Sequence, residues 1–214
     1  MSKAYAVMGE SGGGKTTAMR TLSPDESYYI DCDGKGLSWK GWREQYNAEK
    51  KNYIKTDKQD KVLSIMDGID KKCPKIHNII IDTINSIMIA DERRRIDEKT
   101  YDKWSDLAWS VYDICIKASQ MRDDLNVIIL AHTQTEVDEN TGERFTRILT
   151  NGKKLNKIGL EKYFTTVLLC KKSGDRFVFE TQANRSTCKT PFGAFSEEEI
   201  PNDMQAVLDA LKDY

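Results

Sequence analysis

The residues of this sequence best suited to chemistry form a glycine-rich segment close to its start. They match the pattern G-x-x-x-x-G-K-[ST] and are Gly9, Glu10, Ser11, Gly12, Gly13, Gly14, Lys15 and Thr16. Glycines let a backbone fold around phosphate oxygens because no Cβ stands in the way. The lysine can reach the β- and γ-phosphates of a nucleotide, and the threonine hydroxyl can bind Mg²⁺. The segment therefore predicts a site for ATP and Mg²⁺.

The runs on either side of this segment have the order that a phosphate loop requires. Residues 4–8 form an apolar run typical of a strand, and residues 16–22 form a helix-prone run. The first N–H groups of such a helix, and its positive dipole end, attract anions. A glycine-rich turn with an incidental lysine is the alternative that this context disfavours. We expect the nucleotide to contact Gly9, Glu10, Ser11, Gly12, Gly13, Gly14, Lys15, Thr16 and Thr17.

An aspartate ends a run of isoleucines in the first half of the chain. Asn78 and three isoleucines lead directly into Asp82. Ligands in open α/β sheets bind at the carboxyl ends of the strands, and phosphate-loop enzymes place an acidic residue there to hold Mg²⁺. We expect Asp82 to orient Mg²⁺ through water, together with Thr16. An ordinary strand end with a solvated aspartate is the alternative.

Two further aspartates, Asp31 and Asp33, follow the apolar run at residues 28–30. Carboxylates at the same sheet edge as a phosphate loop can activate water for attack on a phosphate. Asp33 lies further out and is the better candidate for this base. The alternative is that both residues only form a turn before Gly34.

Polar residues also follow the apolar run at residues 127–130, where His132, Thr133 and Gln134 stand in succession. A polar side chain at that strand end would face the γ-phosphate and report its presence to the next loop, as in other nucleotide switches. We expect His132 or Gln134 to have this signalling role. A structural histidine is the alternative.

The elements that must position these residues alternate along the chain. Strand-like apolar runs and helical patterns follow one another, which predicts an α/β fold with a mostly parallel, twisted sheet flanked by helices. The expected strands are residues 4–8, 28–30, 52–56, 76–82, 126–131, 163–170 and 176–180. The expected helices are residues 16–22, 59–71, 101–122 and 201–211, and residues 136–147 are expected to form a polar hairpin.

Composition limits the possible classes of protein. The 214 residues suit one α/β domain over residues 1–214, and 39% hydrophobic with 31% charged residues indicates a soluble chain. Five scattered cysteines and two histidines form no zinc pattern and indicate a reducing cytoplasm. No apolar run would span a membrane, and a strand at the start leaves no room for a signal peptide. The formal net charge of −1 means that nucleic-acid binding would need local basic patches.

The order of these motifs resembles the RecA-like P-loop ATPase core of recombinases. In this resemblance, Asp33 stands at the place of the family's catalytic glutamate, and Gln134 lies close to its γ-phosphate-sensing glutamine. Arg185 matches a cation that reaches the ATP of a neighbouring subunit. Ala183 stands where a second cation is usual, and Lys189 is a substitute for it. The shorter carboxylate of Asp33 implies weak or DNA-stimulated hydrolysis.

The chain most resembles the short, phage-encoded single-strand annealing proteins of the Sak group, which consist of this core alone. That resemblance implies a protein of the host cytoplasm that forms a ring or filament with ATP between subunits. It also implies single-stranded DNA as a partner, a single-strand-binding protein as a candidate for its delivery, and no membrane. Annealing or recombination of DNA is the function that it suggests.

Two basic segments are candidates for DNA contacts. By the same resemblance, Arg93, Arg94 and Arg95 occupy the first DNA loop, and the second loop contains Arg144, Phe145, Arg147, Lys153 and Lys154. Cations neutralise phosphates and aromatic rings stack on bases, which suits binding without sequence preference. The alternative is a solvated charged surface, because carboxylates flank the three arginines.

Two other functions remain open from the sequence. A small nucleoside or nucleotide kinase would also carry an early phosphate loop, and its arginine-rich lid could be Arg93, Arg94 and Arg95. An ATP-dependent loader or switch protein would bind a partner with negligible turnover.

Overall fold

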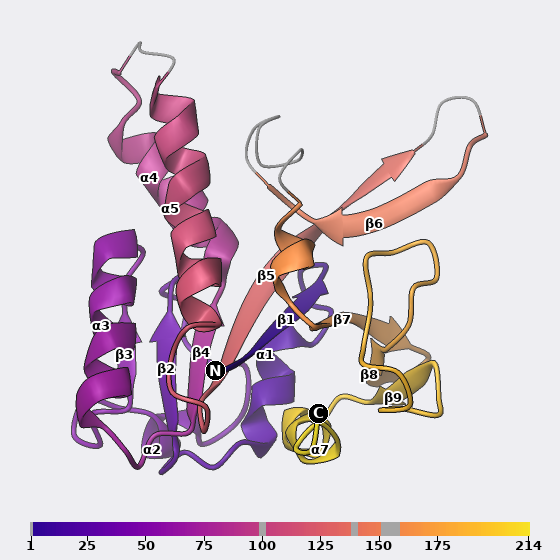
Figure 1. Cartoon of the computed structure of the whole chain (residues 1–214), viewed down its shortest axis with the longest axis horizontal. Coiled ribbons are helices and arrows are strands. Elements are labelled where there is room, and N and C mark those ends of the chain that lie inside the picture. Colours follow the sequence, from indigo (N-terminus) through magenta and orange to yellow (C-terminus); the bar gives the residue numbers. More distant parts are fainter. Residues whose placement is uncertain (1, 99–101, 138–140, 151–158) are drawn as a thin grey trace.

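The computed structural model describes residues 2–98, 102–137, 141–150 and 159–214, and a nine-stranded sheet lies at its centre (Figure 1). The strand order is β3-β2-β4-β5-β1-β7-β8-β9, with β6 paired to β5 beyond the main sheet. All neighbours from β3 to β7 are parallel, whereas β8, β9 and β6 pair antiparallel. The bounds are β1 Lys3–Gly9, β2 Ser27–Asp31, β3 Tyr53–Lys55, β4 Asn78–Asp82, β5 Asn126–Val137, β6 Arg144–Ile148, β7 Thr166–Ser173, β8 Arg176–Glu180 and β9 Glu199–Pro201.

Helices cover both faces of this sheet, so the expected mostly parallel α/β fold is confirmed (Figure 1). One face packs against α3, α4 and α5, and the other packs against α1, η1 and α7. The helices are α1 Lys15–Ala18, η1 Met19–Thr21, α2 Trp42–Gln45, α3 Gln59–Lys72, α4 Ile84–Arg94, α5 Asp102–Ala118, η2 Leu160–Tyr163 and α7 Met204–Ala210.

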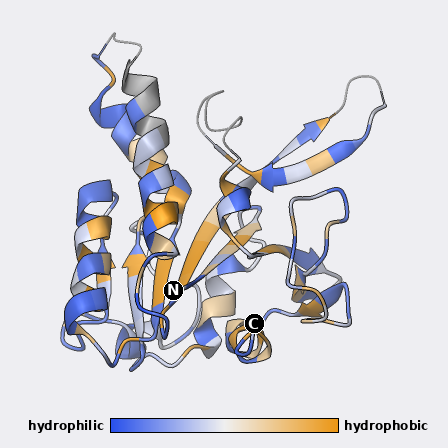
Figure 2. Cartoon of the chain, viewed as in Figure 1, coloured by the Kyte–Doolittle hydropathy of each residue, from blue (hydrophilic) through white to orange (hydrophobic). Residues whose placement is uncertain are grey.

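The central strands are apolar at every position because both of their sides are buried. In β4, Ile79 and Ile81 belong to the core beneath α3, α4 and α5, while Ile80 between them belongs to the opposite core. All three are fully buried. The strands in the middle of the sheet are accordingly orange in Figure 2. Two-sided burial fixes these strands and thereby the positions of the polar residues at their carboxyl ends.

Two structures extend beyond the carboxyl edge of the sheet (Figure 1). One is the helical pair α4 and α5, and the other is the antiparallel ribbon of β5 and β6. β5 belongs to both the core and the ribbon, because residues 126–130 pair with β4 and residues 133–137 pair with β6. The expected polar hairpin is therefore confirmed on the described residues.

Several expectations about elements were wrong. Arg93 and Arg94 were expected in a DNA loop, yet they belong to α4, whose Ile84, Ile87 and Met88 are buried at helical spacing against the core. The C-terminal helix begins at Met204 rather than residue 201, because Pro201 belongs to β9 and the Asp203 side chain caps the helix by accepting from Ala206 N. The strand expected at residues 126–131 continues to residue 137. Among the described residues, no helix is both long and apolar enough to cross a bilayer.

Candidate functional site

The glycine-rich segment connects the end of β1 to the start of α1, as the motif predicted. Gly14, just before the helix, has a φ of 99°, a conformation that favours glycine. Gly9 needs its missing side chain for another reason, since a Cβ there would lie 2.5 Å from the carbonyl oxygen of Cys170 on β7. The loop is thus held close to the neighbouring strand, with the first N–H groups of α1 at its end.

Lys15 folds back over this loop and is almost completely buried. Its Nζ donates to the carbonyl oxygens of Gly9 at 2.7 Å and Glu10 at 2.8 Å, and lies 3.4 Å from Nδ1 of His132. Burial lowers the pKa of Lys15, and the nearby Asp82 carboxylate opposes that change. Phosphate oxygens can replace the two carbonyl oxygens as partners of the ammonium group.

Asp82 lies at the tip of β4, directly beside the start of α1. Its Oδ2 accepts hydrogen bonds from Thr16 Oγ1 at 2.7 Å and from the Tyr29 hydroxyl at 2.5 Å. Its Oδ1 is buried and has no hydrogen-bond partner among the described residues. Burial raises the pKa of Asp82, and the two hydroxyl donors act against that rise. A carboxylate oxygen that lacks a partner next to a threonine hydroxyl fits Mg²⁺ with its water ligands.

The two aspartates after β2 have different surroundings. Asp31 is buried and accepts hydrogen bonds at 2.8 Å from the backbone N–H groups of Gly34 and Gly36, and at 2.6 Å from the Tyr53 hydroxyl. Because its oxygens are occupied by donors of its own turn, Asp31 holds the loop after β2. The turn-forming alternative therefore describes this aspartate.

Asp33 reaches across to the connection between β4 and α4. Its Oδ1 accepts from Thr83 Oγ1 at 2.8 Å and from Ser86 Oγ, while its Oδ2 contacts the ammonium group of Lys35. Burial acts to raise the pKa of Asp33, but hydrogen bonds from Lys35, Ser86 and Thr83 outweigh it and lower the pKa to about 2. The peptide bond joining Asp82 to Thr83 is cis. Asp33 is thus at the expected sheet edge, with donors on both of its oxygens.

The structure separates the two candidate signalling residues. His132 pairs in register with Gly9, which brings its ring to Lys15, and its backbone N donates to Asn85 Oδ1 at 2.7 Å. Burial, followed by the charge of Lys15, lowers the pKa of His132. Gln134 lies in the ribbon opposite Arg147 and donates to Glu136 Oε1 at 3.0 Å. His132 is therefore the residue in contact with the lysine of the phosphate loop.

The three arginines after Asp82 lie at the end of α4 rather than in a loop. Arg93 and Arg94 are in its last turn, and Arg95 follows as its cap. Arg94 contacts the carboxylate of Asp57. Arg95 forms ion pairs at 2.7 Å with Glu98 and 2.9 Å with Asp106. Two of the three predicted DNA contacts thus have carboxylate partners.

The second set of predicted DNA contacts lies on β6. Arg144 is exposed, and 43% of the surface of Phe145 is accessible. Arg147 is more enclosed and lies 3.9 Å from a carboxylate oxygen of Glu161. Lys153 and Lys154 fall outside the described residues. The ribbon therefore presents a cation and an aromatic ring to solvent.

Arg185 lies beside the ribbon and is 68% exposed at its side chain. Its carbonyl oxygen accepts from Thr146 N at 2.8 Å, and its guanidinium is 3.8 Å from Glu143. The structure thus places Arg185 at the surface, next to β6.

Four contacts of the site were not anticipated from the sequence. The Tyr29 hydroxyl binds Asp82, Asn85 binds the backbone at His132, the Cys170 thiol donates to Gly13 O at 2.9 Å, and Lys35 contacts Asp33. The position of Lys35 between two glycines after a strand-tip aspartate is the only local signal among them. The others depend on which strands are neighbours.

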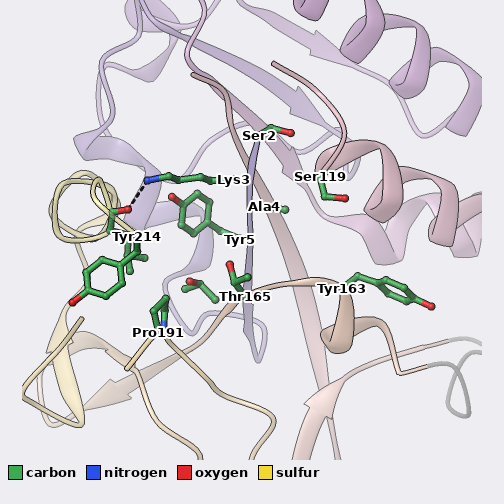
Figure 3. A pocket seen from close by; sticks show the side chains of 11 residues that line it. Ser2, Lys3, Ala4, Tyr5, Ser119, Tyr163, Thr165, Pro191 and Tyr214 are labelled. Carbon is green, nitrogen blue, oxygen red and sulfur yellow. Dashed lines mark hydrogen bonds between the residues drawn. The ribbon is translucent and has the colours of Figure 1, made fainter. Parts of the chain in front are cut away.

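A separate cavity of about 450 Å³ lies at the opposite end of β1 (Figure 3). Tyr5, Tyr163, Pro191 and Tyr214 are among its lining residues. Its one lysine, Lys3, points toward the end of α7 and donates to the Leu211 carbonyl oxygen at 2.6 Å. Since this cavity lies at the amino end of the strands, it is distinct from the phosphate loop.

The phosphate loop between β1 and α1 and the buried Asp82 beside Thr16 define a P-loop nucleotide-binding site at the carboxyl edge of an α/β sheet. A family model described as an AAA domain matches residues 1–191. The chain belongs to this family of P-loop ATPase domains. A comparison with curated proteins found no match.

Proposed function

We propose that this protein is a RecA-like, ATP- and Mg²⁺-dependent protein of phage type that binds and anneals single-stranded DNA. The observation that carries the proposal is one sheet edge that holds the phosphate-loop residues Lys15 and Thr16, the strand-tip carboxylates Asp82 and Asp33, and two projecting structures with cations. The nucleotide site and the candidate DNA surface are thus adjacent, which is what a protein needs if its nucleotide controls its binding to DNA.

Each residue of the nucleotide site has a defined task in this proposal. Lys15 would exchange its two carbonyl partners for β- and γ-phosphate oxygens. Thr16 and the free Oδ1 of Asp82 would hold Mg²⁺, which supplies charge neutralisation at the phosphates. Asp33 would orient the attacking water, and His132 would respond to changes at Lys15.

The ribbon of β5 and β6 supports the DNA-binding part of the proposal. Exposed Phe145 suits stacking on a base, and exposed Arg144 suits contact with a phosphate. Arg93, in the last turn of α4, is also exposed and belongs to the helical pair that extends beyond the same sheet edge (Figure 1). These contacts would not depend on the base sequence of the DNA, because they involve only its charged backbone and the faces of its bases.

We further propose that residues 1–214 act as one core domain within a ring or filament. Exposed Arg185 would reach the nucleotide of a neighbouring subunit, as arginine fingers do in other P-loop enzymes. A single-strand-binding protein is the proposed source of the DNA.

The test is nucleotide-dependent DNA affinity. Fluorescence anisotropy of a labelled oligothymidine would be measured with Mg²⁺ and either a non-hydrolysable ATP analogue or no nucleotide. The analogue is expected to tighten binding in the wild type and to have no effect in Lys15→Ala, while annealing of complementary strands follows the same pattern. Wild-type affinity that is unchanged by the analogue would rule out nucleotide control of DNA binding.

A small kinase is the second candidate, and one cavity favours it. A space of about 410 Å³ adjoins Asp33 and is lined by Cys32, Asp33, Asp57, Ser86, Ile89, Ala90, Arg93 and Arg94. An acceptor bound there would lie next to two carboxylates and two arginines. Transfer of labelled phosphate from ATP to any nucleoside or nucleotide in a broad screen would establish this function, and its absence would remove it.

A further inference from the structure

The loop after β2 has a backbone that is fixed from several sides. The Asp31 carboxylate binds the N–H groups of Gly34 and Gly36, and Lys55 Nζ donates to the Gly34 carbonyl oxygen at 2.9 Å. Gly34 and Gly36 have positive φ angles of 70° and 84°, which reverse the chain direction on both sides of Lys35. The fold therefore fixes the backbone on both sides of Lys35, whose side chain contacts Asp33.

The Lys35 side chain is much more exposed than its ion-pair partner. It is 56% exposed, whereas its partner Asp33 is only 12% exposed. An exposed lysine keeps a flexible four-carbon stem and an ammonium group with three donors. In the structure that group contacts Asp33 Oδ2, and Thr83 and Ser86 occupy the other oxygen. Asp33 would therefore remain held by two hydroxyl groups if Lys35 moved away.

The charge of Lys35 affects three ionisable groups of the phosphate site. Burial is the main cause that lowers the pKa of Lys15 and His132, and the Lys35 ammonium lowers both further. Burial raises the pKa of Asp82, and the same ammonium opposes that rise. The loop that carries Lys35 also contacts the nucleotide site directly, because Asp33 N donates to the Asp82 carbonyl oxygen at 3.3 Å and Ser38 Oγ lies 2.9 Å from Thr17 Oγ1. Lys35 therefore belongs to a loop that packs against the candidate Mg²⁺ ligand and against α1.

Phosphoryl-transfer sites stabilise the charge that develops on the terminal phosphate with a positioned cation. Lys15 in the phosphate loop and Lys35 in contact with Asp33 are two cations at this sheet edge, where Lys171 and Lys172 also line a cavity beside Glu10 and Gly13. We propose that Lys35 is a second phosphate-binding lysine of the site, whose ammonium exchanges Asp33 for the terminal phosphate of bound ATP and so uncovers one oxygen of Asp33. This inference rests on the proposed ATP-binding function and extends it to a residue of the same subunit.

The exchange makes Lys35 selective for the nucleotide with three phosphates. ADP has no terminal phosphate in reach, so the contact with Asp33 would persist in the ADP complex. Loss of one charge-assisted contact should therefore weaken binding of a triphosphate and leave binding of ADP nearly unchanged. A surface ion pair between neighbours in sequence would change neither affinity.

The experiment measures dissociation constants for Mg²⁺ complexes of ADP and of a non-hydrolysable ATP analogue by titration calorimetry. Lys35→Met is expected to weaken binding of the analogue by about ten- to a hundredfold and binding of ADP by less than about twofold. Lys35→Arg is expected to restore most of the analogue affinity because it keeps the charge. Lys40→Met, an exposed lysine of the same loop region, is the matched control and should leave both constants unchanged.

A second measurement shows whether the variant affects only the local pair. The pKa of the Asp33 carboxyl, followed by NMR without nucleotide, should rise from about 2 in Lys35→Met because a donor is lost. A raised Asp33 pKa together with a wild-type ratio of analogue to ADP affinity would overturn the proposal, because Lys35 would then only pair with Asp33. If the wild type and Lys15→Ala bound neither nucleotide, the proposed function itself would fall and this inference with it.

Discussion

At the scale of single residues, Asp31 and Asp82 show how surroundings separate two similar carboxylates. They stand opposite each other at the ends of adjacent parallel strands, and both are buried. Asp31 has N–H and hydroxyl donors on both oxygens, whereas one oxygen of Asp82 has no partner among the described residues. The first carboxylate therefore stabilises a turn, and the second is available to a metal ion.

Substitution of Asp82 should affect metal binding, whereas substitution of Asp31 should affect stability. Asp82→Asn removes the charge that attracts Mg²⁺ but keeps an oxygen for Thr16, so Mg²⁺ should no longer strengthen ATP binding while the fold persists. Asp31→Asn replaces one acceptor oxygen by a donor, which should destabilise the protein by about 1–3 kcal/mol. Calorimetric titration with and without Mg²⁺, together with thermal unfolding, measures both effects. A Mg²⁺ response retained in Asp82→Asn would contradict its role as the metal ligand.

The pairing of Asp33 predicts a loss of stability at acid pH. Its pKa in the folded protein is about 2, below the usual value of about 3.9 for an unfolded aspartate. The charged form thus stabilises the fold fully above about pH 4, and this contribution disappears as the pH falls toward 2. After allowance for solvent screening, it amounts to about 1 kcal/mol.

Comparison of the wild type with Asp33→Asn measures this contribution. The difference between their free energies of unfolding should be largest at pH 5 and should shrink progressively toward pH 2. An equal difference at all pH values would show that the carboxylate of Asp33 is not stabilised by its charge.

At the scale of elements, the ribbon and the α4–α5 pair are the two structures that extend beyond the carboxyl edge of the sheet (Figure 1). The core strands end at nearly the same level, but β5 continues by seven residues beyond its pairing with β4, from Ala131 to Val137. Residues 132–136 are all polar, and residues 133–137 pair with β6. An edge ribbon with exposed Val137 and Phe145 is open to a ligand on its surface.

Variants of the ribbon should weaken DNA binding without affecting ATP binding. Phe145→Ala is expected to cost about 1–3 kcal/mol of affinity for oligothymidine, the value of one stacked base. Arg144→Gln should reduce the slope of log affinity against log salt by about 0.7. Tyr214→Ala, which removes an exposed ring at the other end of the molecule, is the control. Equal losses in all three variants, or none, would contradict binding on the ribbon.

Local sequence pattern was sufficient for most elements of the fold. Apolar runs placed the central strands, because two-sided burial demands apolar residues at every position. α4 was not predicted because its buried Ile84, Ile87 and Met88 are interrupted by polar residues and followed by a charged run, which leaves only a short helical pattern. The phosphate loop, Asp82 and the hairpin were all found at the right positions.

Contacts between distant segments could not be derived in this way. The placement of β1 between β5 and β7 decides that His132 meets Lys15 and that Cys170 meets Gly13. Strand order depends on the packing of the whole chain rather than on any one segment. For the same reason the sequence could not choose between His132 and Gln134.

At the scale of the whole molecule, the two ends of the sheet differ in chemistry. The carboxyl edge holds the charged residues of the phosphate site, whereas the amino end of β1 has a largely apolar cavity (Figure 3). In the proposed arrangement, the exposed Arg185 beside the ribbon would reach the nucleotide of a second molecule, and a complete site would need two copies of the chain.

Mixing of variants tests this shared site. Lys15→Ala and Arg185→Ala should each abolish DNA-stimulated ATP hydrolysis, and a mixture of the two should recover part of it, because some interfaces would combine intact halves. Electron microscopy with single-stranded DNA and an ATP analogue should show rings or filaments. Monomers under all conditions, or a mixture that stays inactive, would contradict a shared site.

The continuity of β5 has a consequence for changes in chain length. Its inner half sets the position of His132 beside the phosphate loop, and its outer half sets the pairing with β6. One residue inserted between Leu130 and His132 would turn every later side chain to the opposite face. Insertions and deletions within this strand should therefore abolish the proposed function. At the hairpin turn near Gly142 they should have no effect, because a change in length there leaves both halves of the strand in register.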